Sequence, residues 1–239
     1  MQDILERIDL ITLALAGITA IGIYAAVDGV ARLGKVSGEY GRKAIHISIG
    51  IFSATFPMYM NRTEIFIFHG LFFVGTVALS LSSDFVRHHP WAAKFKIGRI
   101  LAGLFERYED VSRWTIGQFL YPLSLLLVVL FFDDLLIYSF SVLMLALADG
   151  FAAVIGKPFG KIIFYVPGGK KSLVGSFTFF MIAFTLMCVF LIIETEAGYI
   201  ALVPAVMYAL TITFFEAMIA GGFDNLAVPL MTAILLNTI

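Results

Sequence analysis

The sequence predicts an all-α, polytopic membrane protein with seven or eight transmembrane helices and its N-terminus outside. The first observation is composition, because 60% of the 239 residues are hydrophobic, only 14% are charged and the mean hydropathy is +0.96. Soluble domains are typically about 45–50% apolar and about 25% charged, so a water-soluble fold could not bury this much apolar surface. The second is that the apolar residues form long continuous runs, whereas a membrane β-barrel needs alternating strands. The third is the placement of the basic residues, which sets the orientation.

Eight stretches of the chain are nearly free of charge, and a spanning helix needs about 20 mostly apolar residues. They are residues 10–27, 44–60, 65–83, 114–132, 135–155, 172–193, 197–215 and 225–239. The last stretch is short, so it either spans the membrane or forms a half-span or re-entrant piece. Residues 1–7 carry two acidic residues and one Arg, so the first stretch is expected to be an uncleaved helix and not a signal peptide. The length indicates one membrane domain over residues 1–239.

The basic residues predict the orientation of this domain. All but two of the sixteen Lys and Arg residues lie in the connections 31–43, 84–113 and 156–171, which share one side of a consistent threading. Only Arg7 and Arg62 fall on the other side. The positive-inside rule assigns the side that carries most of the Lys and Arg residues to the cytoplasm. Residues 84–113 mix apolar and basic side chains, so we expect an amphipathic segment on the membrane surface, either as a connector on anionic lipid or as an access route for substrate.

Composition also excludes some classes of function. The net charge is -1 and no basic arm is present, so the sequence gives no reason to expect a nucleic-acid partner. Cys188 is the only cysteine, which excludes a disulfide framework or a cysteine-rich zinc site and indicates helix packing.

Placing an ionisable residue within or at the end of a span costs free energy, so each such residue indicates a function unless a purely structural role accounts for it. Arg42, Lys43 and His46 open the second span, and Arg42 and His46 share one helix face because they are four residues apart. The structural alternatives are that Arg42 and Lys43 only set the membrane topology and that His46 only bonds a neighbouring helix. Asp149 stands alone in an apolar span and needs either a cation or a metal ion as partner. The structural alternative for Asp149 is an ion pair without a catalytic role.

Residues 156–175 are expected to form a cytoplasmic phosphate-binding loop. They contain five glycines, four lysines and Ser172, directly before an apolar run. Glycines let backbone N–H groups approach an anion, lysines supply positive charge, and the following helix adds its N-terminal dipole. The composition suits a nucleoside triphosphate, although the spacing is not that of the phosphate loop of soluble NTPases.

A last polar cluster follows the seventh span, where Glu216 is followed by Asp224 and Asn225. With Asp149, the carboxylates Glu216 and Asp224 could hold Mg²⁺, which usually takes one or two carboxylates plus substrate phosphates. The structural alternative is that Asp224 or Asn225 caps the last helix. Taken together, the clusters supply carboxylates, cations and a glycine-rich loop on one membrane face. Phosphoryl transfer needs this inventory, and an acceptor at such a site would be a lipid.

Four motifs in this order resemble the CTP-dependent polyprenol kinase family, which includes dolichol kinases, phytol kinases and the yeast-type diacylglycerol kinase. The matching segments cover most of the chain, from the second span to the last. They are Arg42-Lys43-x-x-His46, Asp149 to Gly160, Lys171-Ser172-Leu173-Val174-Gly175-Ser176, and Glu216 with Asp224-Asn225-Leu226-Ala227-Val228-Pro229. Two positions depart from the family pattern, since Ala148 stands where Gly is frequent and Val174 where Glu is usual.

The resemblance implies an integral membrane kinase, in a cell or ER-type membrane, that transfers the γ-phosphate of CTP to a polyprenol-type alcohol such as dolichol, phytol or geranylgeraniol, with Mg²⁺. Asp149, Asp224 and Glu216 would serve as metal ligands or base, and His46 would bond a phosphate or orient a carboxylate. The nucleotide would contact Arg42, Lys43, Lys157, Gly160, Lys170, Lys171, Ser172, Gly175, Ser176 and Asn225. One alternative is the related CDP-diglyceride synthase reaction, which makes a CDP-lipid. Another is an ion-coupled transporter, which should show inverted repeats and charges near mid-membrane.

Overall fold

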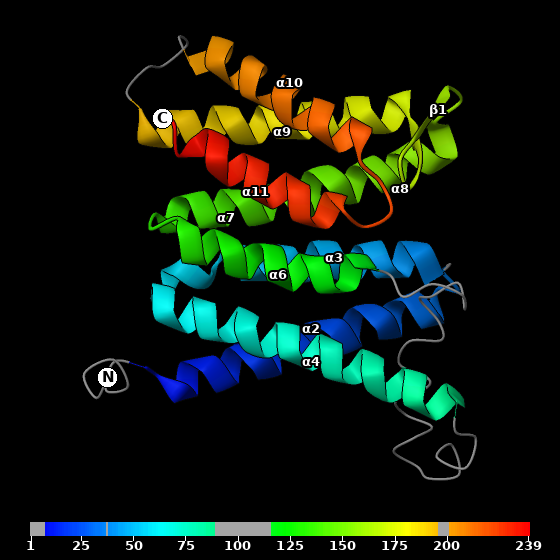
Figure 1. The fold of residues 1–239 in the computed structure, drawn as a ribbon, viewed down its shortest axis with the longest axis vertical. Helices are drawn as coiled ribbons and strands as arrows, with labels where there is room; N and C mark the ends of the chain where they lie inside the picture. Colours follow the sequence, from blue (N-terminus) through cyan, green and yellow to red (C-terminus); the bar gives the residue numbers. More distant parts are fainter. Residues whose placement is uncertain (1–7, 37, 89–115, 196–200) are drawn as a thin grey trace.

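The computed structural model describes residues 8–36, 38–88, 116–195 and 201–239, and these are almost entirely helical (Figure 1). A 3-10 turn, η1 (Phe56–Met58), precedes α4, and a π-helical segment, η3 (Met144–Asp149), joins α7 to α8 in one continuous run. A hairpin of β1 (Ile163–Val166) and β2 (Gly169–Ser172) follows α8. The α-helices are α2 (Leu10–Leu33), α3 (Gly38–Ala54), α4 (Arg62–His88), α6 (Ile116–Phe131), α7 (Leu135–Leu143), α8 (Gly150–Phe159), α9 (Leu173–Glu194), α10 (Leu202–Met218) and α11 (Asp224–Leu236).

Within the described residues, every predicted span overlaps a helix or the continuous α7–η3–α8 run. Within the described residues, three helical runs are long and apolar enough to cross a membrane, namely Leu10–Leu33, Leu135–Phe159 and Leu173–Glu194. Three shorter apolar helices, Gly117–Phe131, Leu202–Met218 and Asp224–Leu236, accompany them. The chain is therefore an all-α membrane protein with one small hairpin, while the number of spans stays a prediction. The predicted amphipathic segment 84–113 lies outside the described residues beyond His88, where α4 ends.

The core of the bundle lies around α7 and η3. Figure 1 shows the helices side by side in a stack, with α9 and α10 on one side of α7 and α3, α4 and α2 on the other. The π-helical segment packs against α3, α9 and α11, and its residues Met144 and Leu145 are fully buried. The outermost helix α2 buries only Ala16, Asp28 and Ala31. Its exposed Leu and Ile side chains give this helix the apolar surface that lipid requires.

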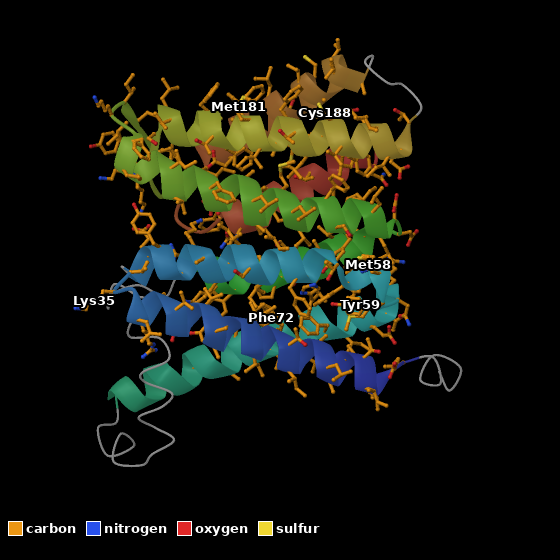
Figure 2. The ribbon with its side chains drawn as sticks, turned by 180° about the vertical axis from the view of Figure 1, so that it is seen from behind. Lys35, Met58, Tyr59, Phe72, Met181 and Cys188 are labelled. Carbon is orange, nitrogen blue, oxygen red and sulfur yellow. The ribbon has the colours of Figure 1, made fainter. Side chains whose placement is uncertain are left out.

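The two ends of the bundle differ in their polar groups. Lys35 lies at the end that carries the hairpin, and Met58 and Tyr59 lie at the opposite end (Figure 2). The two described basic connections therefore share one end, as the charge pattern predicts. At the opposite end, buried Glu64 accepts hydrogen bonds from the backbone N–H groups of Asp9 at 2.7 Å and Asn61 at 2.8 Å. These bonds satisfy N–H groups near the start of two helices, so this end is built for stability.

Candidate active site

Small residues bring α3 into close contact with the π-helical segment. A Cβ atom added at Gly50 would lie 2.3 Å from the Cβ of Ala146, and one at Gly150 would lie 2.5 Å from the Cγ1 of Ile47. Such contacts require glycine, because small residues let helix backbones approach closely in a membrane. The π-helical turn ends at Asp149, and such turns are rare and often lie at functional sites.

The close packing places Asp149 against the first turns of α3. The Nζ atom of Lys43 donates a hydrogen bond of 2.6 Å to the Oδ2 atom of Asp149, and both side chains are largely buried. His46, one turn further along α3, bonds through Nε2 to the carbonyl oxygen of Leu145 at 3.3 Å. The contacts of the structural alternatives are therefore present: Asp149 forms an ion pair, and His46 bonds a neighbouring helix. Both side chains nevertheless line the same cavity, described below.

The predicted loop 156–175 is more ordered than its composition indicates. Helix α8 continues to Phe159, the hairpin occupies residues 163–172, and α9 starts at Leu173. The prediction of a loop over all of residues 156–175 was wrong in part, because glycine serves for packing here: a Cβ at Gly156 would lie 2.7 Å from the Cα of Gly175. In the hairpin turn, Gly168 has a φ of 89°, a conformation that favours glycine.

Ser172 links the hairpin, α8 and α9. Its side chain caps α9 by accepting a 3.1 Å bond from the backbone N–H of Gly175, and its hydroxyl donates to the carbonyl of Gly156 at 2.9 Å. The N-terminus of α9 therefore opens beside the hairpin, where Gly175 and Ser176 line the cavity. The buried hydroxyl of Ser176 has no hydrogen-bond partner in the described part of the chain. A helix N-terminus with such a hydroxyl is suited to an anion.

Lys171 joins the hairpin to two carboxylates, Glu216 near the end of α10 and Asp224 at the start of α11. Its Nζ donates to the Oε1 of Glu216 and, at 3.3 Å, to the Oδ2 of Asp224. Burial lowers the pKa of the Lys171 ammonium, but the charges of Glu216 and Asp224 outweigh it and hold the pKa above its ordinary value. Glu216 is only 3% exposed, and its Oε2 has no partner among the described residues.

One cavity of about 1030 Å³ brings the four polar clusters together at the hairpin end of the bundle. Every site residue that the sequence predicts lies on its wall. These are Arg42, Lys43 and His46 from α3, Asp149, Lys157 and Gly160 from the α8 region, Lys170, Lys171, Ser172, Gly175 and Ser176 from the hairpin and α9, Glu216 from α10, and Asp224 and Asn225 from the start of α11. Their chemical roles stay predictions. Val174, the main departure from the family pattern, is not among the lining residues.

The structure adds residues that the sequence did not single out. Glu39 lines the cavity and forms an ion pair with Lys157 at its rim. Gly117, at the start of α6, accepts a 2.9 Å bond from the side-chain amide of Asn225. The acidic Glu39 in an otherwise basic connection was a usable signal, whereas nothing in the sequence marks Gly117. Neither Asp224 nor Asn225 is the N-cap of α11, where Phe223 stands without a side-chain bond, although the Oδ1 of Asp224 accepts a 3.1 Å bond from the first-turn N–H of Asn225.

The carboxylates suit a metal ion only in part. Within the described residues, no three His, Cys, Asp or Glu side chains are grouped closely enough to hold a metal ion. Glu216 and Asp224 nevertheless contact the same ammonium, and the free Oε2 of buried Glu216 is a hard oxygen donor. Mg²⁺ is usually held by one or two carboxylates with substrate phosphates. The donor set therefore fits a two-carboxylate Mg²⁺ site that phosphates complete, with Asp149 outside it.

Fold and cavity together define a class, a helical membrane protein with a charged cavity at one end that is lined by lysines, carboxylates and a helix N-terminus. A probable chloroplastic phytol kinase of Triticum aestivum is 30% identical over 224 residues, covering 89% of this chain and 71% of that protein. A phytol kinase of Synechocystis is 33% identical over 130 residues, 53% of this chain and 56% of its own length. A probable chloroplastic phytol kinase 1 of Oryza sativa is 27% identical over 225 residues, 89% and 68% of the two chains. No family profile and no solved structure matches. The chain belongs to the polyprenol kinase family, that of the phytol kinases.

Proposed function

We propose that this protein is a lipid-alcohol kinase that transfers the γ-phosphate of CTP to a polyprenol-type alcohol of the phytol class, with Mg²⁺ as cofactor. One observation carries the proposal: a single cavity gathers buried carboxylates, buried lysines and the N-terminus of α9 in a chain related to phytol kinases. Ligand pockets are typically about 300–1,000 Å³. A cavity of about 1030 Å³ is large enough for a nucleotide and the head of a lipid alcohol.

The phosphates of CTP are assigned to the hairpin side of the cavity. Ser172 fixes the N-terminus of α9, and the unpartnered hydroxyl of Ser176 lies in the first turn. Lys170 and Arg42 also line the cavity, and neither forms an ion pair within the described residues. Backbone N–H groups at a helix N-terminus and nearby cations both favour binding of phosphates.

Glu216 and Asp224 are assigned to Mg²⁺, together with the phosphates of the nucleotide. The bound ion would neutralise charge on the phosphates, which is its usual contribution to phosphoryl transfer. Lys171 lies between these carboxylates and the start of α9, so it can serve either group.

The acceptor alcohol is assigned to the deeper wall, formed by Asp149 and His46. A carbonyl oxygen only accepts hydrogen bonds, so the Nε2 of His46 carries the proton that bonds Leu145. In the neutral ring, Nδ1 then keeps a lone pair that can accept a proton from the alcohol. Lys43 holds Asp149 in place at 2.6 Å. The alcohol would place its hydroxyl here and leave its isoprenoid tail in lipid.

We also propose that the cavity faces the cytoplasm or the compartment equivalent to it. The support is that the basic connection at Lys35 and the lysine-rich hairpin share one end of the bundle (Figure 2). The positive-inside rule assigns such an end to the inner side.

A direct assay tests the proposal. Purified protein in detergent is incubated with Mg²⁺, CTP labelled in the γ-phosphate, and phytol, geranylgeraniol, dolichol, diacylglycerol or phosphatidate in turn. Labelled phosphate on an isoprenoid alcohol is the expected result, with Asp149→Asn as the matched inactive control. Formation of a CDP-lipid with release of pyrophosphate would overturn the proposal in favour of a cytidylyltransferase. Failure to label any alcohol, with a folded protein, would also overturn it.

A further inference from the structure

The ammonium of Lys171 occupies the position between two carboxylates that a metal ion would need. Its Nζ contacts an oxygen of Glu216 and, at 3.3 Å, an oxygen of Asp224. The three side chains are largely buried, with side-chain exposures of 15% for Lys171, 3% for Glu216 and 17% for Asp224. Ion pairs that are shielded from water in this way are screened little by salt, so the contact is a strong competitor for other cations.

The charges of the inner cavity are nearly balanced without any added ion. Lys43 and Lys171 supply two positive charges, and Asp149, Glu216 and Asp224 supply three negative charges. The rim pair of Glu39 and Lys157 adds no net charge. Each of these carboxylates already contacts an ammonium, so together they attract a free divalent cation less strongly than unpaired carboxylates would.

Lys171 also lies beside a second place where an anion could bind, the N-terminus of α9. It is the residue before Ser172, which caps α9, so its stem starts beside the helix N-terminus that lines the cavity. Lysine is a compact point charge on a flexible stem of four carbons, and it can change partners with little rearrangement of the backbone. Phosphates bound at the start of α9 would therefore attract the same ammonium that now pairs with Glu216 and Asp224.

We propose that Lys171 and the divalent cation compete for Glu216 and Asp224, and that nucleotide phosphates draw Lys171 away, so that tight metal binding requires the nucleotide. The inference deepens the proposed function and rests on it, since the nucleotide is the group that moves Lys171. By thermodynamic linkage, the metal must then strengthen nucleotide binding by the same factor. Lys171 is a positioning residue in this account, because it controls when the carboxylates are available.

Direct measurement of Mn²⁺ binding tests the competition without turnover. Mn²⁺ affinity is measured by electron paramagnetic resonance on the purified full chain in detergent, with and without CTP and in the absence of lipid alcohol. In the wild type we expect weak binding without CTP and tight binding with it. In Lys171→Met without CTP, we expect binding at least about tenfold tighter than in the wild type, because one competing unit charge is removed at contact distance. Lys161→Met, an exposed lysine beside the hairpin that does not line the cavity, is the matched control and should bind Mn²⁺ as the wild type does.

Even if Lys171→Met does not fold, the wild-type measurement can overturn the competition. Equal Mn²⁺ affinity with and without CTP would overturn the competition, as would a folded Lys171→Met that binds Mn²⁺ no more tightly than Lys161→Met. If the wild type labels an alcohol in the kinase assay but fails these tests, only the competition is wrong. If it labels no alcohol, the proposed function is wrong, and the Mn²⁺ affinity of Lys171→Met without CTP still decides whether Lys171 blocks the carboxylates.

Discussion

Gly50→Ala tests whether close packing of α3 on the π-helical segment positions the active site. The added Cβ would lie 2.3 Å from the Cβ of Ala146, whereas carbon atoms pack at about 3.5–4.0 Å. The shortfall is about 1.2–1.7 Å, and neither Cβ can rotate away, so the two helix backbones must separate. Overpacking of this kind typically costs about 1–3 kcal/mol of stability.

The separation would act directly on the two contacts that position the deeper wall. The 2.6 Å bond from Lys43 to Asp149 and the 3.3 Å bond from His46 to Leu145 both cross this helix pair. A misplacement of about 1 Å at a reacting group can lower the rate about 100-fold. We therefore expect the kcat of alcohol phosphorylation to fall by about that factor, with a lower Tm in detergent.

Gly22→Ala is the matched control, because a Cβ at Gly22 in α2 meets no atom within 4 Å. Its activity and Tm should match those of the wild type within error. Kinase assays and thermal unfolding of both purified variants provide the measurement. If Gly50→Ala retains the activity and Tm of Gly22→Ala, close packing of α3 does not position the site and the reasoning is refuted.

Three further predictions concern the cavity itself. Asp149→Asn leaves the buried Lys43 ammonium without its counter-ion, which should cost about 3–5 kcal/mol and lower kcat at least about 100-fold; a variant as active as the wild type in the kinase assay would contradict the assigned role. Ser172→Ala removes the cap of α9, which should cost about 1 kcal/mol and lower the Tm by about 2–4 °C, and an unchanged Tm on thermal unfolding would show that the cap contributes nothing. Chelation of divalent cations should abolish phosphorylation of the alcohol and added Mg²⁺ should restore it, whereas full activity in excess chelator would exclude the metal.

The helical framework could be predicted because its signals are local. Each predicted span, such as residues 172–193, is a continuous apolar run, and a lipid environment requires such a run to satisfy its backbone hydrogen bonds as a helix. The start of α9 could be predicted for the same reason, because Ser172 directly precedes the apolar run and caps the helix. The hairpin was missed because glycine and lysine composition predicts exposure and charge, but does not predict the pairing of Tyr165 with Lys170.

The members of the candidate site were also predicted, but their partners were not. Charged residues in apolar runs are costly wherever they occur, which is why Asp149 and Glu216 could be singled out from the sequence alone. The pairing of Lys43 with Asp149 joins residues 106 positions apart, and that of Lys171 with Glu216 joins residues 45 positions apart. Such pairings depend on how closely helices approach, which the glycine contacts set in three dimensions.

The sequence by itself determined that this protein is helical and membrane-embedded and that its costly polar groups cluster near the same ends of its spans, because hydrophobicity and charge act residue by residue. Only the tertiary structure decided that these groups line one cavity and that two lysines pair with three carboxylates there. The physical reason is that electrostatic contacts require side chains to meet within a few ångströms. That proximity is a property of the packed bundle, in which Gly50 against Ala146 and Gly156 against Gly175 bring α3, α8 and α9 together.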